Sequence, residues 1–406
     1  MSPNSPVRRL ADWDREWLQA VAAEYGTPTY VIDLERIREN LTRLEAAFSE
    51  AAIRYAVKAN AGRAVLETVA AAGVGAECAS AGEVRRALEA GFDPADVHYT
   101  PVNPPDRDLD AVLVAGGDPI AITAGSVDTI QRVAERGFTG DLAIRIHPGT
   151  GAGHSEAVAT GADAKFGIPV GRVPEAVEIA QDYGLSVVGL HVHAGSGILD
   201  DLDAHRQVVE TVADVARTLD TTLDFVDVGG GFGVPYHSEQ PPLDLDDIAA
   251  TTREALGDLD VELRIEPGRY VVADAGVLLT AVNTTKPAGD GVLAGVDAGM
   301  TDLLRPALYD AYHPVRSLTT EPRDTASVTV VGPICESTDV LAEDRQLPTP
   351  KRGDLLAVGL TGAYGIEMAS QYNSRPRPPV VAKDGAASRQ VRRREQIEDL
   401  LATEVS

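Results

Sequence analysis

The chain has 406 residues, of which 44% are hydrophobic and 24% charged, enough for a sizeable core and for more than one average domain. Its formal net charge, 36 − 62 = −26, argues against nucleic acid or an anionic membrane as a partner. Two cysteines, Cys78 and Cys335, cannot build a disulfide framework and lack zinc-ligand spacing. No apolar run approaches the ~18 residues of a membrane span, and charges interrupt the opening residues where a signal peptide would be apolar. These features predict a soluble, cytoplasmic protein.

Arginine largely replaces lysine in this chain, which has five lysines among its 36 basic residues. Together with the strong acidity, this composition resembles that of proteins that work in a salty cytoplasm. We therefore expect a halophilic protein, with an ordinary acidic enzyme as the alternative.

Two kinds of segment alternate from residue 34 to residue 272. Helical patterns rich in Ala, Glu and Arg include residues 34–48 and 80–91, and the second opens with Ser80 and Glu83 in the spacing of a capping box. Nearly continuous apolar runs, typical of parallel strands covered on both faces, lie between the helices. They span residues 53–60, 75–80, 96–100, 120–123, 142–148, 187–196, 223–231 and 262–268. Eight such units predict an α/β fold with a (β/α)8 barrel; a doubly wound sheet is the alternative, but no GxGxxG opens the first unit.

The alternation stops after residue 275. Apolar runs at residues 276–285, 291–299, 327–334 and 354–360 are separated by turn residues, which predicts a second, β-rich domain resembling a sandwich or barrel. We expect the barrel over residues 36–275 and the β-rich domain over residues 276–406, joined by an N-terminal strand from residues 1–35. Residues 387–406 are predicted to form a helix with a solvated basic face.

A single lysine interrupts the apolar run "RYAVKANAG", residues 54–62. Strand alternation places Lys58 on the face opposite Tyr55 and Val57. At the carboxyl end of a barrel strand the amine would point into the barrel mouth, where desolvation lowers the pKa of an amine and makes it a better nucleophile. A lysine that reaches to solvent at the strand end is the alternative.

The stretch "HVHAGSG", residues 191–197, places two imidazoles on one strand face. A zinc pair would need a third ligand, and none follows at a suitable spacing, so no metal is expected. Either ring could be structural, whereas His193 stacked on a planar cofactor is the sharper interpretation.

Two further strand ends carry candidate binding groups. Three glycines at residues 229–231 could direct backbone N–H groups at a phosphate, although any tight turn uses such glycines. In "IEPGR", a buried Glu266 needs a partner. A protonated pyridine nitrogen would suit it; an ion pair with Arg269 is the alternative.

The β-rich region adds "DAGMTDLLRPALYDAYH", "GPICESTD" and "LTGAYGIEM". With the lysine, histidine, glycine and EPGR stretches, this combination resembles the fold-type III pyridoxal-phosphate decarboxylases, and within them the diaminopimelate decarboxylase branch, over most of the chain. The resemblance implies that Lys58 bonds covalently to pyridoxal 5'-phosphate (PLP) and that Cys335 donates a proton. It further implies cofactor contacts by His193, Ser196, Gly230, Gly231, Glu266, Pro267, Gly268, Arg269 and Tyr364, and substrate contacts by Arg269, Arg305, Tyr309, Glu336 and Tyr364.

The expected reaction is decarboxylation of meso-2,6-diaminopimelate to L-lysine and CO2, the last step of lysine biosynthesis. Arg305 for a distal carboxylate and Glu336 for an amine favour this substrate. The resemblance also implies a homodimer, since Cys335 and Glu336 reach the active site from the partner subunit. A polyamine-precursor decarboxylase, acting on carboxynorspermidine or ornithine, and a non-catalytic PLP-binding protein are the alternatives. Residues 150–164 are richer in alanine than expected for the family, and we expect them where the substrate enters.

Overall fold

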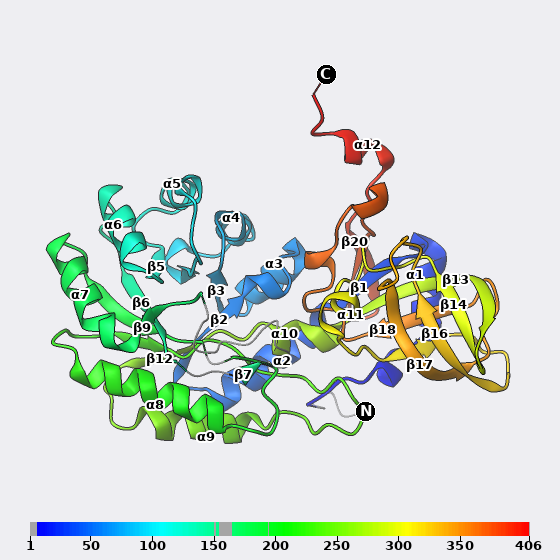
Figure 1. The fold of residues 1–406 in the computed structure, drawn as a ribbon, viewed down its shortest axis with the longest axis horizontal. Coiled ribbons are helices and arrows are strands. Elements are labelled where there is room, and N and C mark those ends of the chain that lie inside the picture. The colour runs from blue at the N-terminus through cyan, green and yellow to red at the C-terminus, as the bar shows by residue number, and fades with distance from the viewer. Residues whose placement is uncertain (1–5, 150–151, 154–164, 194, 406) are drawn as a thin grey trace. The chain divides into compact units, whose positions relative to one another are not determined.

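The computed structural model describes residues 6–149, 152–153, 165–193 and 195–405. The chain divides into two compact units (Figure 1). The barrel unit comprises Asn40–Val234 and Pro241–Val271; the sheet unit comprises Met1–Glu39, Pro235–Gln240 and Val272–Ser406.

Within the described residues, the barrel unit contains eight parallel strands in the order β5-β4-β3-β2-β12-β11-β9-β6. They close into a ring because β5 also pairs with β6. The strands are β2 (Ala51–Ala56), β3 (Gly75–Cys78), β4 (Val97–Tyr99), β5 (Ala121–Ala124), β6 (Leu142–His147), β9 (Val187–His191), β11 (Phe225–Asp227) and β12 (Glu262–Ile265). These are the eight segments expected from the sequence, so the predicted barrel is confirmed. Three short strands lie outside the ring: β8 (Ile168–Pro169) pairs with β6, and β7 (Ala152–Gly153) with β10 (Gly195–Ser196).

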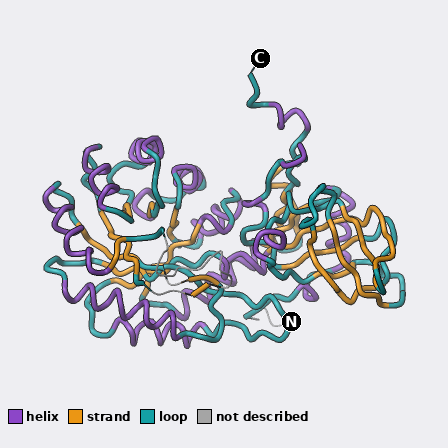
Figure 2. Tube along the Cα trace, viewed as in Figure 1, coloured by secondary structure: helices purple, strands orange, loops and turns teal. Residues whose placement is uncertain are grey.

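Helices follow the barrel strands along the chain, and Figure 2 shows this alternation of orange strands and purple helices. They are α3 (Arg63–Ala71), α4 (Ala81–Glu89), α5 (Asp106–Ala115), α6 (Val127–Glu135), α7 (Val173–Asp182), α8 (Asp203–Thr218) and α9 (Leu245–Leu256), while α2 (Leu34–Ala47) and α10 (Arg269–Val272) run from one unit into the other. The Ser80 hydroxyl accepts a bond from the N–H of Glu83 at the start of α4, as predicted, and the Glu83 carboxylate accepts one from the N–H of Ala79 at 2.7 Å. Such reciprocal caps satisfy N–H groups that have no partner within the helix.

The sheet unit contains nine strands: β1 (Thr29–Asp33), β13 (Gly276–Ala288), β14 (Gly291–Val296), β15 (Val315–Ser317), β16 (Thr325–Val331), β17 (Val340–Pro348), β18 (Leu355–Gly359), β19 (Val380–Asp384) and β20 (Ala387–Arg392). Its main path runs β17-β16-β14-β13-β1-β19-β20, and β18 joins β13 to β15. The N-terminal strand β1 is central: it is antiparallel to β13 and parallel to β19. Helices α1 (Arg15–Tyr25), α11 (Arg305–Tyr309) and α12 (Ile397–Leu401) also belong to this unit.

The helix predicted for residues 387–406 is wrong over its first part. Residues 387–392 form β20, which pairs antiparallel with β19, and only α12 is helical in the remainder. Edge-strand pairing prevails here over the intrinsic helix preference of Arg and Gln.

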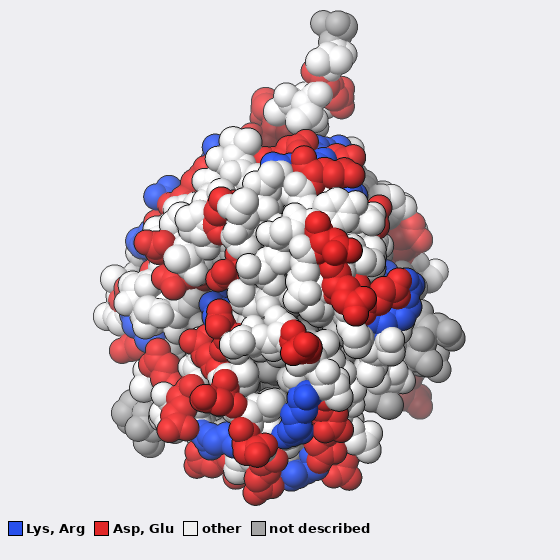
Figure 3. Space-filling view, turned by 90° about the vertical axis from the view of Figure 1, so that its left-hand side faces the viewer, with Lys and Arg blue, Asp and Glu red and all other residues white. Residues whose placement is uncertain are grey.

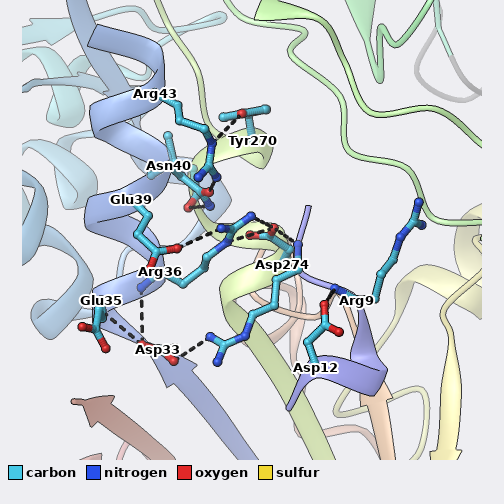
Figure 4. Close-up of polar contacts among 12 residues, drawn as sticks. Arg9, Asp12, Asp33, Glu35, Arg36, Glu39, Asn40, Arg43, Tyr270 and Asp274 are labelled. Carbon is cyan, nitrogen blue, oxygen red and sulfur yellow. Dashed lines mark hydrogen bonds and ion pairs between the residues drawn. The ribbon is translucent and has the colours of Figure 1, made fainter. Parts of the chain in front are cut away.

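Buried ion pairs lie beneath the start of α2 in the sheet unit (Figure 4). Arg36 and Asp274, each with a side chain only 3% exposed, pair at 2.7 Å, and Arg36 also contacts Glu39 at 2.9 Å. Asp33 accepts from Arg8 at 2.6 Å and from Lys383 at 2.9 Å, which holds the pKa of its carboxyl below the usual value despite burial. Charges taken out of water in this way are stable only because they are paired.

Among the charged side chains on the face drawn in Figure 3, acidic ones cover more of the surface than basic ones. In the part of the chain that the structure describes, no helix is both long and apolar enough to span a bilayer.

Candidate active site

Lys58 lies just beyond the end of β2, close to the buried carboxylate of Glu77 on β3. Its Nζ is 2.6 Å from Glu77 Oε2; the Lys58 side chain is 41% exposed and that of Glu77 only 2%. The strand stops at Ala56, and residues Val57–Ala59 form a 3-10 turn. The alternation that we used to orient Lys58 therefore does not apply, but the carboxyl end of β2, which was the basis of the prediction, is its actual position.

Glu266 follows β12 and is 4% exposed. One carboxylate oxygen, Oε2, lies 3.1 Å from Nε2 of His191, and the other, Oε1, is buried with no hydrogen-bond partner among the residues that the structure describes. Burial, together with the charge of Glu77, raises the pKa of Glu266 to about 8, although Lys58 opposes the shift. An oxygen left in this state costs free energy until a donor reaches it.

Asp227, at the end of β11, is a second buried carboxyl group near Glu266. Burial and the charge of Glu266 raise its pKa to about 7, and its Oδ1 accepts from the N–H of Gly229 at 2.8 Å. One ligand atom each of Asp227, Glu266 and His98 lie within 4.8 Å of one another. Because the two carboxyl groups are so close, protonation of one of them is favoured. A cation placed beside Asp227 and Glu266 would therefore strongly favour their ionised forms.

His193 is held as a neutral ring by the glycine turn after β11. Its Nδ1 accepts from the N–H of Gly230 at 3.2 Å, so the ring proton is assigned to Nε2. Burial and nearby Lys58 lower its pKa well below the usual value. A Cβ at residue 230 would lie 2.4 Å from the carbonyl oxygen of Glu266, so only glycine fits at this position.

Polar groups from three strand ends converge beside this turn. The carbonyl of Gly231 accepts from the N–H groups of Gly197 and Ile198 at 3.1 and 2.9 Å. Arg269, 8% exposed, donates to the hydroxyl of Ser196 at 3.3 Å. The preceding turn is tied to β2, since the Pro267 carbonyl accepts from the N–H of Ala56 at 3.1 Å and a Cβ on Gly268 would touch the Ala56 side chain at 3.0 Å. A buried guanidinium with a hydroxyl beside it is a donor set that suits a phosphate.

In the sheet unit, the guanidinium of Arg305 is 2% exposed at the start of α11. Its Nη1 donates to Tyr236 Oη at 3.1 Å and lies 2.8 Å from His313 Nε2. Tyr309 ends the same helix and is half-buried. Tyr364 is half-buried with a left-handed backbone, φ 56°, in the glycine-flanked turn.

Cys335 and Glu336 are adjacent and exposed in the sheet unit. The Cys335 thiol lies 3.4 Å from Oδ1 of Asn373, and Tyr372 donates a short hydrogen bond to Glu336, whose negative charge raises the pKa of the Tyr372 phenol. Both partners come from the single stretch of residues 371–374.

Five residues with clear roles in this geometry were not singled out from the sequence. Glu77 and Asp227 are acidic residues within apolar runs, and we assigned them no role from the sequence. His191 was considered only as one member of a possible zinc pair. His313 and Tyr236 lay inside quoted stretches, but nothing in their spacing revealed their common contact with Arg305. The alanine-rich stretch at residues 150–164 lies outside the described residues, apart from Ala152 and Gly153.

The barrel-unit residues fit PLP. The unpartnered Glu266 oxygen suits a protonated pyridine nitrogen, the neutral His193 ring suits an aromatic face, and Arg269 with Ser196 suits the phosphate. Lys58 is the amine that could bond to the aldehyde.

Comparison with known proteins agrees with this fit. Residues 34–273 match the family described as "Pyridoxal-dependent decarboxylase, pyridoxal binding domain". A diaminopimelate decarboxylase from Methanothermobacter thermautotrophicus is 43% identical over 94% of this chain and 92% of its own length, and one from Escherichia coli K12 is 35% identical over 99% and 100%. A crystal structure of diaminopimelate decarboxylase from Helicobacter pylori complexed with L-lysine superimposes with a TM-score of 0.89 at 34% identity, covering 95% of this chain and 98% of that one. The chain belongs to the pyridoxal-dependent decarboxylases, within their diaminopimelate decarboxylase family.

Proposed function

We propose that this protein decarboxylates meso-2,6-diaminopimelate to L-lysine and CO2 with PLP as its cofactor, the last step of lysine biosynthesis. The observation that carries the proposal is the presence, at the barrel strand ends, of an amine, Lys58, and of a buried carboxylate oxygen, Glu266 Oε1, that has no hydrogen-bond partner among the described residues. The named activity of the relatives that match nearly the whole chain supports the choice of substrate.

Each barrel residue has a task set by its contacts. When bound, PLP supplies an electron sink for the carbanion left by loss of CO2. Lys58 would anchor the cofactor covalently, and Glu77 is placed to pair with the ammonium form of Lys58. Glu266 would keep a proton on the pyridine nitrogen, and the neighbouring Asp227 and His191 would influence the ionisation of Glu266. The residues that would hold the phosphate are Ser196, Gly230, Gly231, Pro267, Gly268 and Arg269, and Tyr364 would complete this set.

The substrate-binding residues distinguish the proposed substrate from close alternatives. Arg305 would hold the distal carboxylate and Glu336 the distal amine, with Arg269, Tyr309 and Tyr364 completing the set. Cys335 would protonate the α-carbon after CO2 leaves. Ornithine offers Arg305 no distal carboxylate to bind, so it would be rejected.

We propose a homodimer in which Cys335 and Glu336 complete the partner's active site. Their exposure within one chain supports this arrangement. Mixing refolded Lys58→Ala and Cys335→Ala chains tests it, because a mixed dimer regains one intact site. We expect about a quarter of wild-type activity in the mixture; activity no higher than that of either variant alone would contradict shared sites.

We also propose that the protein is cytoplasmic and adapted to high salt. The net charge of −26 and the acidic face in Figure 3 support the adaptation, since salt screens repulsion among exposed carboxylates.

The function is tested with purified protein, PLP and meso-diaminopimelate, measuring CO2 and L-lysine. Lys58→Ala should abolish both the absorption band of bound cofactor and turnover, whereas Lys286→Ala, at an exposed position of β13, should change neither. A panel containing ornithine and carboxynorspermidine examines the alternative substrates. Cofactor binding without turnover of meso-diaminopimelate would contradict the proposal.

A further inference from the structure

The contacts of His313 define one protonation form of its ring. Its Nε2 lies 2.8 Å from Nη1 of Arg305, and its Nδ1 lies 2.9 Å from the carbonyl oxygen of Gly359. A guanidinium N–H can only donate and a carbonyl can only accept. Nδ1 therefore carries the proton, and Nε2 offers its lone pair to Arg305. Both contacts agree on this neutral tautomer.

His313 is also fixed in place by the sheet. The side chain is fully buried, and Gly359 donates its N–H to the carbonyl of Pro314 at 2.8 Å. His313 lies two residues before β15, whose Val315 pairs antiparallel with Val358 of β18. The acceptor presented to Arg305 is thus held beside a regular ladder.

Tyr236 is the second residue that contacts the guanidinium of Arg305. Its ring lies edge-to-face with His313 at 5.5 Å, and the guanidinium carbon of Arg305 lies 5.0 Å from the ring centre. Its hydroxyl accepts from the same Nη1 that meets His313. Two neutral acceptors orient the guanidinium and leave its positive charge in place. An aspartate or glutamate at either position would neutralise that charge.

We propose that His313 is a positioning residue that aims Arg305 at the distal carboxylate of the substrate and so contributes to substrate specificity. This inference rests on the proposed function, in which Arg305 binds that carboxylate. His313 itself does not need to touch the substrate. Its contribution is to remove rotamers of Arg305 that point elsewhere, which lowers the entropy lost when the carboxylate binds.

The test compares two ligands that differ by one carboxylate. L-Lysine retains the group that Arg305 would hold, and 1,5-diaminopentane lacks it. Their dissociation constants are measured by calorimetry on the PLP-loaded enzyme, a readout independent of turnover. His313→Asn keeps a donor near Nδ1 but removes the acceptor at Nε2, whereas His313→Gln keeps an acceptor near Nε2.

We expect His313→Asn to weaken L-lysine binding about tenfold, consistent with loss of one hydrogen bond to a charged group, and to leave 1,5-diaminopentane unchanged. His313→Gln should restore most of the affinity for L-lysine. The KM for meso-diaminopimelate should rise with the L-lysine constant while kcat changes little. A general loss of structure would instead weaken both ligands and alter the circular dichroism spectrum.

Arg305→Gln separates the two proposals. If it loses L-lysine selectivity and His313→Asn does not, the positioning role is wrong and the proposed function stands. If Arg305→Gln binds L-lysine like the wild type, and the wild type does not turn over meso-diaminopimelate, the proposed function fails. Should His313→Asn not fold, His313→Gln decides: a folded His313→Gln that binds L-lysine about as poorly as Arg305→Gln would overturn the proposal.

Discussion

Replacing Glu266 with glutamine should make the cofactor-free protein more stable at alkaline pH. The pKa of Glu266 is about 8 in the folded chain against 4.5 for an ordinary glutamate, because burial and the charge of Glu77 oppose its ionisation. An acid whose pKa is raised by folding contributes stability below its unfolded pKa and loses that contribution as pH rises toward the folded value. The sensitive window is therefore about pH 4.5 to 8.

The magnitude follows from the two pKa values. Their difference, 8 − 4.5 = 3.5, corresponds to about 5 kcal/mol at about 1.4 kcal/mol for each pKa unit. At pH 8 the folded carboxyl is half ionised, so about 4 kcal/mol of this loss is expressed. Glutamine keeps the shape and a partner for His191 but does not titrate, so the advantage of Glu266→Gln should grow from near zero at pH 4.5 to several kcal/mol at pH 8.

Urea unfolding followed by circular dichroism measures this difference, because Trp13 and Trp17 both lie in the sheet unit and fluorescence would miss the barrel. Glu50→Gln, which removes one exposed carboxylate, is the matched control and should show no such growth. Saturating PLP should reverse the order at pH 8, since in the proposed site the cofactor's cationic nitrogen would pair with Glu266 but not with glutamine. A stability difference that is the same at pH 5 and pH 8 would refute this account of the site.

Three further outcomes are expected. Arg36→Ala should lower the free energy of urea unfolding by about 3–5 kcal/mol, because it leaves Asp274 buried without the guanidinium. Arg38→Ala, whose partner Asp384 is half exposed, should lower it by less than about 1 kcal/mol. Equal losses would contradict the role of burial. Gly230→Ala should weaken PLP binding about tenfold or more in a fluorescence titration, since the added Cβ would meet the Glu266 carbonyl. The control variant Gly171→Ala, whose added Cβ would meet no atom of the described residues within 4 Å, should bind PLP normally. Normal binding by both variants would argue against the tight turn. The melting temperature should rise between about 0.1 M and 1 M KCl, as the Debye length falls to about 3 Å, and an unchanged value would count against adaptation to salt.

The barrel could be predicted because its strands are covered on both faces and therefore appear as apolar runs with little ambiguity. All eight predicted segments overlap a barrel strand. The strand β20 could not be predicted in this way, because an edge strand carrying Arg389 and Arg392 shows no apolar alternation and is fixed by pairing with β19. Local sequence does not reveal such a partner.

Candidate site residues could be named from the sequence where chemistry is concentrated in short motifs, and they were missed where it depends on distant contacts. Lys58 and Glu266 stand out as charges at the ends of apolar runs. The turn that holds Lys58 does not show in the pattern, because Val57 and Ala59 are apolar in either a strand or a 3-10 turn. The link from Gly359 through His313 to Arg305 joins residues 46 and 8 positions apart, and only the fold reveals it.

The central position of β1 in its sheet determines when, during synthesis of the chain, this strand can pair on both sides. Tyr30 aligns with Val380, so a further 380 − 30 = 350 residues must leave the ribosome after Tyr30 before this strand has both neighbours. The barrel strands are synthesised in between and can form their own ring during that time. A chain cut short before residue 380 would retain β1 with one bare edge, a ready template for association with other nascent chains.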